Sequence, residues 1–138
     1  MRTLAEWLEF IERQHPKTIA LGLDRVSAVH RRMRTELACP VITVAGTNGK
    51  GSTCAMLEAI LRAAGYRVGV YTSPHLRRYH ERVRIAGDFA SDSDLLTAFA
   101  AVEDARVGDA GNGATPLTYF EFGTLATLWL FARAKLDA

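Results

Sequence analysis

The sequence predicts an α/β fold in which helices flank a mostly parallel sheet. Three observations favour this fold: residues 41–44 are rich in β-branched side chains, glycines and a helical pattern follow at once, and residues 67–72 show a second short strand pattern. A strand, a helix and a second, parallel strand make a right-handed crossover. Ligands of such sheets bind at the carboxyl ends of the strands. We therefore expect residues 46–52 and 73–75 to lie at the same edge of the sheet.

The composition excludes several classes of protein. With 138 residues, of which 49% are hydrophobic and 23% charged, the chain predicts one ordered globular domain. A net charge of +2 is too small to indicate a nucleic-acid partner. Cys39 and Cys54 lack metal-binding spacing, which favours a reducing, cytoplasmic location. The chain has no run of about 18 apolar residues, so no membrane span is predicted.

Helices are predicted on both sides of the core. Thr3-Leu4-Ala5-Glu6 is a capping box, and we interpret Trp7, which follows it, as a core residue. A second helix is predicted from Asp24, its cap, to about residue 37. Another is predicted after its cap at residues 91–94, with a buried stripe that extends to Val102, and the last over 117 to about 136. The helix after residue 52 ends at Gly65. Its predicted buried stripe comprises Met56, Leu57, Ile60 and Leu61.

Residues 46–52 predict a phosphate-binding loop. Glycines let successive backbone N–H groups turn inward, and the N-terminus of the next helix favours a phosphate. Lys50 adds a mobile positive charge for the β- and γ-phosphates. The match to G-x-x-x-x-G-K-[ST] is imperfect, because the first glycine falls at Gly46 and Gly51 follows the lysine. We disfavour the alternative, a simple strand–turn–helix junction, because strand, glycines, lysine and hydroxyl pair arrive in the right order.

Ser73-Pro74-His75-Leu76 has two interpretations. A hydroxyl at the carboxyl end of a strand, beside a phosphate loop, could bind a Mg²⁺ ion, which prefers oxygen ligands. The residues alone favour the other interpretation, a turn that contains proline.

Two further sets of charged residues need an interpretation. The basic residues Arg77, Arg78, Arg82 and Arg84 are interpreted as a solvated face, with a basic edge for an acidic substrate such as a glutamyl chain as the alternative. Glu121 is a lone carboxylate in a helix that is apolar on nearly every side. It must be paired, protonated or in contact with a ligand. The glycine-rich loop over 106–115 suggests no ligand.

Taken together, these stretches resemble the N-terminal part of the bifunctional dihydrofolate synthase/folylpolyglutamate synthases of the Mur ligase superfamily. The matching residues are 18–26, 43–53, 71–76, 81–84 and 117–125, in order along nearly the whole chain. The resemblance implies a Mur ligase-like ATP-binding domain, incomplete in this chain. Its expected layout is helical over 1–38, phosphate loop and sheet over 40–87, and helices over 91–136, without the C-terminal glutamate-ligase domain.

The resemblance also implies an activity. Such an enzyme uses ATP and Mg²⁺ to add L-glutamate to dihydropteroate and to folates: the substrate carboxylate attacks the γ-phosphate, and the glutamate amine then displaces phosphate from the acyl phosphate. The implied partners are these small molecules, without nucleic acid or membrane, and the full-length enzyme is expected to be a monomer.

Site residues follow from the same resemblance. The ATP site comprises Gly46, Thr47, Asn48, Gly49, Lys50, Gly51 and Ser52, with Lys50 also catalytic, and Ser73 is the implied Mg²⁺ ligand. The implied pterin site comprises Ile19, Ala20, Leu21, Gly22, Thr118, Tyr119, Phe120 and Glu121, with Phe120 as a stacking surface. Ala20 stands where relatives often have an aspartate, so no polar contact is carried over there.

The remaining parts of the family's site are expected beyond Ala138. They are a glutamate and a histidine that bind Mg²⁺, a carbamylated lysine and the C-terminal domain. We therefore expect the 138-residue chain alone to be inactive. The alternative function is a non-catalytic nucleotide-binding fragment. A cell-wall amino-acid ligase is a weaker alternative, because those enzymes usually carry threonine at the position of Gly51.

Overall fold

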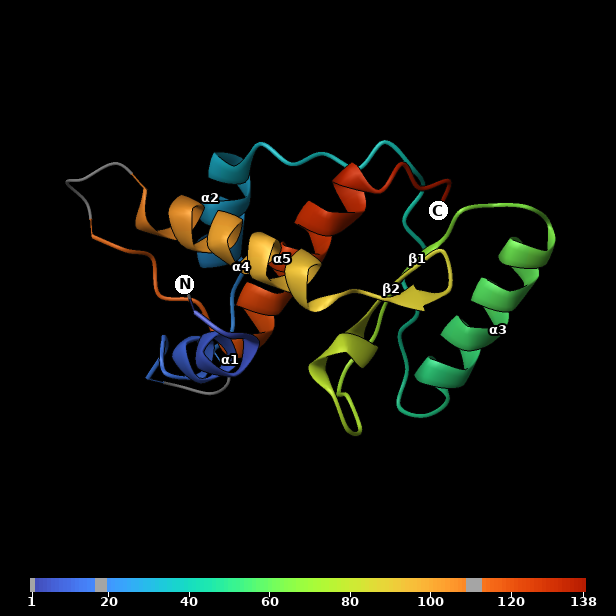
Figure 1. Ribbon diagram of the computed structural model, residues 1–138, viewed down its shortest axis with the longest axis horizontal. Coiled ribbons are helices and arrows are strands. Elements are labelled where there is room, and N and C mark those ends of the chain that lie inside the picture. Colours follow the sequence, from blue (N-terminus) through green and yellow to red (C-terminus); the bar gives the residue numbers. More distant parts are fainter. Residues whose placement is uncertain (1, 17–19, 109–112) are drawn as a thin grey trace. The chain divides into compact units, whose positions relative to one another are not determined.

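The computed structural model describes residues 2–16, 20–108 and 113–138, and the chain divides into two compact units (Figure 1). Unit 1 comprises Met1–Glu36 and Asp92–Leu130, and unit 2 comprises Leu37–Ser91 and Phe131–Ala138. The centre of the predicted glycine-rich loop, residues 109–112, lies outside the described residues. Among the described residues, no helix has both the length and the hydrophobicity that a membrane span requires.

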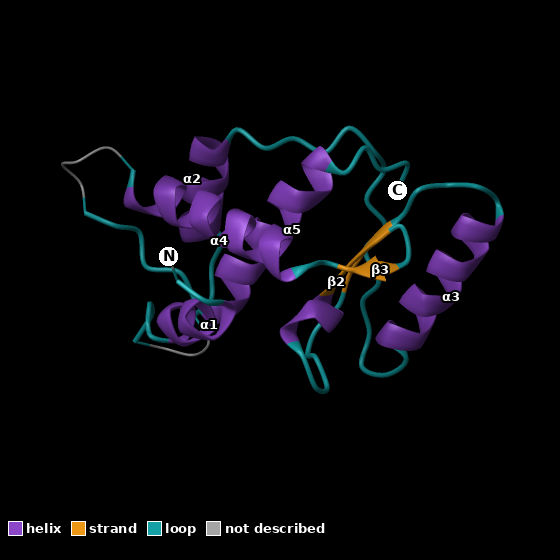
Figure 2. Cartoon of the chain, viewed as in Figure 1, coloured by secondary structure: helices purple, strands orange, loops and turns teal. Residues whose placement is uncertain are grey.

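Unit 1 is helical (Figure 2). Its helices are α1 (Leu4–Glu12), α2 (Asp24–Met33), α4 (Asp92–Val107) and most of α5 (Tyr119–Arg133). The predicted capping box is confirmed: the Glu6 N–H donates to the Thr3 hydroxyl at 3.3 Å, and the Glu6 carboxylate accepts the Thr3 N–H at 2.7 Å. These bonds satisfy donors that the first turn of a helix otherwise leaves without a partner.

Aromatic rings from three helices form the core of unit 1. The ring of Trp7 lies 6.0 Å from that of Phe99 and 6.4 Å from that of Phe122, centroid to centroid, and the two phenylalanines are 5.9 Å apart. All three side chains are buried. Such tilted pairs add roughly 0.5–1.5 kcal/mol each beyond the burial of apolar area. The interpretation of Trp7 as a core residue is confirmed.

Two helices of unit 1 differ from their predicted bounds. Asp24 is the first residue of α2 and does not cap it; the N-cap is Leu23, without a side-chain bond. The helix ends at Met33 because Arg34 takes a left-handed backbone, with φ of 49°. The last helix begins later than predicted, at Tyr119, because Thr118 caps it.

Unit 2 holds a small antiparallel sheet. Strands β1 (Gly69–Tyr71), β2 (Val83–Ile85) and β3 (Asp88–Phe89) lie in the order β1-β2-β3, and a 3-10 helix, η1 (Tyr79–Arg82), leads into β2. Val70 pairs with Arg84, and Arg84 with Phe89. Helix α3 (Lys50–Ala63) contacts β1.

The predicted parallel crossover is not formed among the described strands. Residues 41–45 run into the phosphate loop without strand pairing, and the side chains of Val41 and Ile42 are 67% and 57% exposed. The pairings that the structure describes are all antiparallel. A β-branched run favours an extended backbone, but a strand also needs a neighbour that accepts and donates its ladder hydrogen bonds. The prediction of a strand at residues 41–44 is therefore wrong for the part of the chain that the structure describes.

Glycines shape unit 2 at two points. Gly65 has φ of 89° and ends α3 as predicted: its N–H bonds to the Arg62 carbonyl at 2.9 Å and the Tyr66 N–H to the Leu61 carbonyl at 3.0 Å. Gly69 permits a close approach, because a Cβ there would lie 2.5 Å from the Leu136 side chain.

The basic run of unit 2 is divided between surface and interior. Arg77 and Arg78 are exposed, but Arg82 is buried and Arg84 half-buried. Arg84 forms an ion pair with Glu58 of α3. Its Nη2 donates to Glu58 Oε2 at 2.6 Å, and its Nε donates to the same oxygen at 3.0 Å. The interpretation of the whole run as a solvated face was wrong for Arg82 and Arg84. Because Arg84 is paired with Glu58 and Arg82 is buried, these two residues do not form an exposed basic edge for a substrate.

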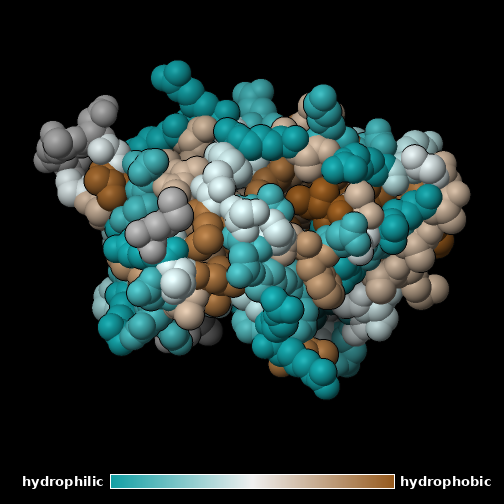
Figure 3. Space-filling model, viewed as in Figure 1, coloured by the Kyte–Doolittle hydropathy of each residue, from teal (hydrophilic) through white to brown (hydrophobic). Residues whose placement is uncertain are grey.

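The predicted buried stripe of α3 is largely exposed. Met56 and Ile60 are 66% and 63% exposed, Leu57 and Leu61 are half-buried, and the buried residue of this helix is Glu58. The packing partner that the stripe would need is not among the described residues. Figure 3 shows hydrophobic atoms at the surface in the region of α3.

We expect the isolated 138-residue chain to self-associate through this face, because exposed apolar patches and unpaired extended segments associate in water. Replacing Met56 and Ile60 together by glutamine should shift the chain toward monomer in sedimentation velocity. Val107→Gln, at an exposed apolar residue of α4, is the matched control and should change little. A wild-type chain that stays monomeric at high concentration would contradict the prediction.

Candidate functional site

The predicted phosphate loop turns at two glycines. Gly46 has φ of 152° and Gly49, the residue that precedes α3, has φ of 77°. Side chains with a Cβ rarely adopt these angles, so the path of the loop depends on glycine at both positions. A Cβ at Gly51 would meet no atom within 4 Å, so the packing of this chain does not itself require glycine there.

The loop leads directly into the N-terminus of α3, which is suited to bind an anion. The N-terminus of α3 has no side-chain cap and no acidic residue in its first turn. Its first N–H groups therefore keep their hydrogen-bonding capacity, and the helix dipole adds partial positive charge at the same place. Residues 46–52 are all exposed.

Lys50 bends back over the loop that precedes it. Its ammonium donates to the carbonyl of Gly46 at 2.6 Å and approaches that of Thr47 at 3.4 Å. A full positive charge is thus held beside the backbone N–H groups and the helix terminus. The three features together can bind a multiply charged phosphate group.

Ser73 lies in the turn directly after β1. Its side chain is exposed, and the preceding Thr72 donates its N–H to the Arg82 carbonyl at 3.0 Å. Within the described residues, no group of three or more histidine, cysteine, aspartate or glutamate side chains could hold a metal ion. Ser73 offers one neutral hydroxyl oxygen, which suits Mg²⁺ chemically as one ligand among several. Its role stays a prediction.

The predicted pterin residues of unit 1 form two groups, and Ile19 lies outside the described residues. Ala20, Leu21 and Gly22 precede α2, and residues 118–121 form the start of α5. Arg25 joins the groups: its Nη2 donates to the Ala20 carbonyl at 3.0 Å and to Glu121 Oε1 at 2.8 Å. Segments almost a hundred residues apart in the sequence are thus held together by one guanidinium.

Glu121 is buried and paired. Its carboxylate accepts the Thr118 N–H at 2.8 Å in addition to the guanidinium of Arg25. Burial raises the pKa of the Glu121 carboxyl, but the hydrogen bonds from Arg25 and Thr118 outweigh it, and the pKa lies below its ordinary value. Of the three predicted possibilities for Glu121, the structure shows the paired one.

Sequence reasoning missed two features of this site. Thr118 and Glu121 make a capping box, since the Thr118 hydroxyl accepts the Glu121 N–H at 3.2 Å. The Thr-x-x-Glu spacing before an apolar run was the available signal. Arg25 was the second omission. A lone carboxylate in an apolar helix requires a cation, but the sequence does not say which of its 17 lysines and arginines supplies it.

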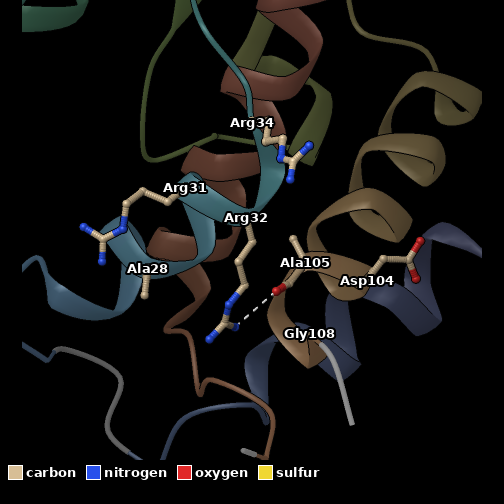
Figure 4. Close-up of a pocket in the computed structure, with 7 residues that line it drawn as sticks. All are labelled: Ala28, Arg31, Arg32, Arg34, Asp104, Ala105 and Gly108. Carbon is tan, nitrogen blue, oxygen red and sulfur yellow. Dashed lines mark hydrogen bonds between the residues drawn. The ribbon is translucent and has the colours of Figure 1, made fainter.

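An open hollow of about 620 Å³ lies elsewhere in unit 1, between α2 and α4 (Figure 4). Its lining residues are Ala28, Arg31, Arg32, Arg34, Asp104, Ala105 and Gly108, none of which is a predicted site residue. Arg32 reaches across to the carbonyls of Ala105 and Arg106, at 3.3 and 3.5 Å. It thereby satisfies carbonyls at the C-terminal end of α4, which have no partner within the helix. The side chains of Arg31 and Arg34 diverge from it.

The loop, the uncapped helix and Lys50 have the arrangement that is expected of a phosphate-binding site in α/β nucleotide-binding proteins. No family model matches the chain. Among curated proteins, the dihydrofolate synthase/folylpolyglutamate synthase of Escherichia coli is 56% identical over 135 residues, 97% of this chain and 31% of the relative. The Haemophilus influenzae protein of the same name is 50% identical over 135 residues, again 97% of this chain and 29% of the relative.

Solved structures agree with these relatives. The E. coli FolC structure in complex with DHPP and ADP has a TM-score of 0.90 at 55% identity, over 99% of this chain and 32% of that chain. The folylpolyglutamate synthetase from Lactobacillus casei has a TM-score of 0.86 at 29% identity, over 99% and 35%. The chain spans about a third of the length of these relatives and corresponds to their N-terminal part. The resemblance and the Mur ligase-like fold class are confirmed for that part.

Proposed function

We propose that this chain is the ATP-binding N-terminal part of a ligase that adds L-glutamate to dihydropteroate and folates. The observation that carries the proposal is the phosphate loop with Lys50 above it, set in a chain 56% identical to a dihydrofolate synthase/folylpolyglutamate synthase. Structures of related proteins contain ADP and DHPP, or Mn, AMPPNP and L-glutamate. ATP, a divalent cation and these substrates are therefore proposed for the protein that contains this chain.

In this proposal, the chain's own residues bind and orient the phosphates of ATP. Backbone N–H groups at the start of α3 would bind phosphate oxygens. The Lys50 ammonium would exchange its hydrogen bonds to loop carbonyls for bonds to the γ-phosphate, and would stabilise the negative charge that develops there. The substrate carboxylate would attack that phosphorus and ADP would leave, which gives an acyl phosphate. The glutamate amine would then attack the acyl carbon, phosphate would leave, and the amine nitrogen would lose a proton as the amide forms. Mg²⁺, when bound, would neutralise charge on the phosphate oxygens, with the Ser73 hydroxyl as one of its ligands.

The two groups joined by Arg25 are proposed as the pterin site. Leu21 and Phe120 are 91% and 54% exposed, so they offer apolar and aromatic surface to a flat ring. Arg25 and Glu121 satisfy each other. In this proposal they hold the two walls of the site and do not contact the ring.

The direct test is a ligation assay on the full-length protein that contains this chain. We expect ADP and phosphate release to depend on both glutamate and a pteroate or folate. Nucleotide binding without substrate-dependent release would favour the alternative, a non-catalytic nucleotide-binding protein. A monomeric state and a cytoplasmic location stay predictions.

The Ser73 hydroxyl is tested by Ser73→Ala in the full-length enzyme. We expect lower turnover and a higher Mg²⁺ concentration for half-maximal rate, because one oxygen ligand is lost. The melting temperature should move little, since exposed loop substitutions change stability by under about 0.5 kcal/mol. Unchanged Mg²⁺ dependence with lowered stability would make Ser73 a turn residue only.

A further inference from the structure

Residues 72–82 of unit 2 form a turn that is held by hydrogen bonds from two consecutive side chains, those of Glu81 and Arg82. The Glu81 carboxylate accepts three successive backbone N–H groups, those of Leu76, Arg77 and Arg78, at 2.8, 2.9 and 2.8 Å. Charge-assisted bonds of this length are about twice as strong as neutral ones. One carboxylate thus holds the distal part of the turn that follows β1.

Arg82, the next residue, holds the other part of the same turn. Its Nε donates to His75 Nδ1 at 2.8 Å, and its carbonyl accepts the Thr72 N–H at 3.0 Å. The guanidinium carbon of Arg82 lies 5.4 Å from the ring centroid of Tyr79, whose ring is 5.9 Å from that of His75. Tyr79 and Arg82 are both buried, so this framework is packed and not only hydrogen-bonded.

Ser73 lies between the anchored points. Thr72 precedes it and His75 follows it by two residues, and both bond to Arg82, while the three N–H groups beyond His75 bond to Glu81. The exposed serine is therefore carried by a turn whose two ends are fixed to one short helix, η1. A metal ligand that has a single neutral oxygen needs such a fixed position, because supporting contacts determine its orientation.

The geometry points to Glu81 as a positioning residue for the Mg²⁺ ligand Ser73, an inference that rests on the proposed function. The backbone N–H groups of Leu76 and Arg78 hold the pKa of the Glu81 carboxyl below its ordinary value, so it stays an ionised acceptor at neutral pH. Without it, three adjacent N–H groups lose their acceptor and the turn loses its distal anchor. Ser73 then samples positions in which its hydroxyl does not reach the ion.

Glu81→Gln in the full-length enzyme tests this, with MgCl₂ titrated at fixed ATP. The amide keeps the size of the side chain but presents an NH₂ group to backbone donors. We expect the Mg²⁺ concentration for half-maximal rate to rise about tenfold, as for other residues that support a metal ligand. The affinity of the ADP-bound protein for Mn²⁺, measured without turnover by electron paramagnetic resonance, should fall by a similar factor. Glu81→Asp keeps the charge on a shorter stem and should give a smaller rise. Glu6→Gln, another carboxylate that accepts a backbone N–H, is the control and should leave Mg²⁺ dependence unchanged.

The double variant Ser73→Ala with Glu81→Gln shows whether Glu81 acts through Ser73. If it does, the double variant has the Mg²⁺ dependence of Ser73→Ala alone, because the positioned hydroxyl is already absent. Additive shifts, or no shift for Glu81→Gln and Glu81→Asp when Ser73→Ala shows one, would overturn the inference and leave the proposed function standing. Failure of the proposed function is seen separately, as wild-type protein that binds nucleotide but releases no ADP in response to glutamate and a folate.

Discussion

Lys50→Ala in the full-length enzyme should abolish ligation while the fold is retained. The Lys50 ammonium is exposed and bonds only to carbonyls of its own loop among the contacts described, so its removal leaves no cavity. In the proposed reaction, its charge would stabilise the negative charge that shifts during phosphoryl transfer. Loss of one such preorganised donor typically lowers the rate by a factor of about 100 to 1,000.

The measurement is the rate of ADP release that depends on folate and glutamate, with circular dichroism as a check of the fold. Lys135→Asn is a matched control: it removes an exposed lysine of unit 2, at φ of 51°, where asparagine is tolerated. Activity of Lys50→Ala within about tenfold of wild type would refute the phosphate-loop assignment, since even one oxyanion donor contributes more than that.

Local features of this fold could be predicted from the sequence because each depends on neighbouring residues. The capping box needs Thr3 and Glu6 three residues apart, and the end of α3 needs a glycine at residue 65. The turn of the phosphate loop likewise follows from Gly46 and Gly49, whose angles favour glycine. These predictions required no knowledge of distant contacts.

Features that depend on contacts between residues far apart in the sequence could not be predicted from the sequence. An extended run such as 41–45 becomes a strand only when another segment pairs with it, and none of the described residues does so. The sequence favours an exposed position for Arg84, because its partner in the structure, Glu58, lies 26 residues away along the chain. Arg25 and Glu121 are 96 residues apart, which hid the contact that organises the proposed pterin site.

Arg25→Ala is expected to destabilise unit 1. It leaves the buried Glu121 carboxylate without its cation. Because the Arg25 side chain is 25% exposed, we expect a loss of about 1–3 kcal/mol, less than for a fully buried pair. It also removes the donor to the Ala20 carbonyl, so residues 20–22 lose their link to α5. In the full-length enzyme, we therefore expect a raised KM for dihydropteroate as well as reduced stability.

The loss of stability can be measured by urea unfolding. The 138-residue chain would carry the glutamine substitutions at Met56 and Ile60, which are expected to keep it monomeric. Arg13→Ala is the matched control, because Arg13 pairs with Glu9 at the surface of α1, where such pairs contribute at most about 1 kcal/mol. Two results would contradict the role of the buried pair: a loss for Arg25→Ala no larger than for Arg13→Ala, or a double variant with Glu121→Gln that shows purely additive losses.

The pH dependence provides a second measure of the same pair. Because the folded-state pKa of Glu121 is lowered, its contribution to stability is fully present above the unfolded carboxyl pKa of about 4.3 and is lost as the pH falls through the folded value. Glu121→Gln removes this titration. The stability difference between wild type and Glu121→Gln should therefore shrink progressively below about pH 4. A difference that is constant from neutral pH down to acid unfolding would show that Glu121 carries no ionised pair with Arg25.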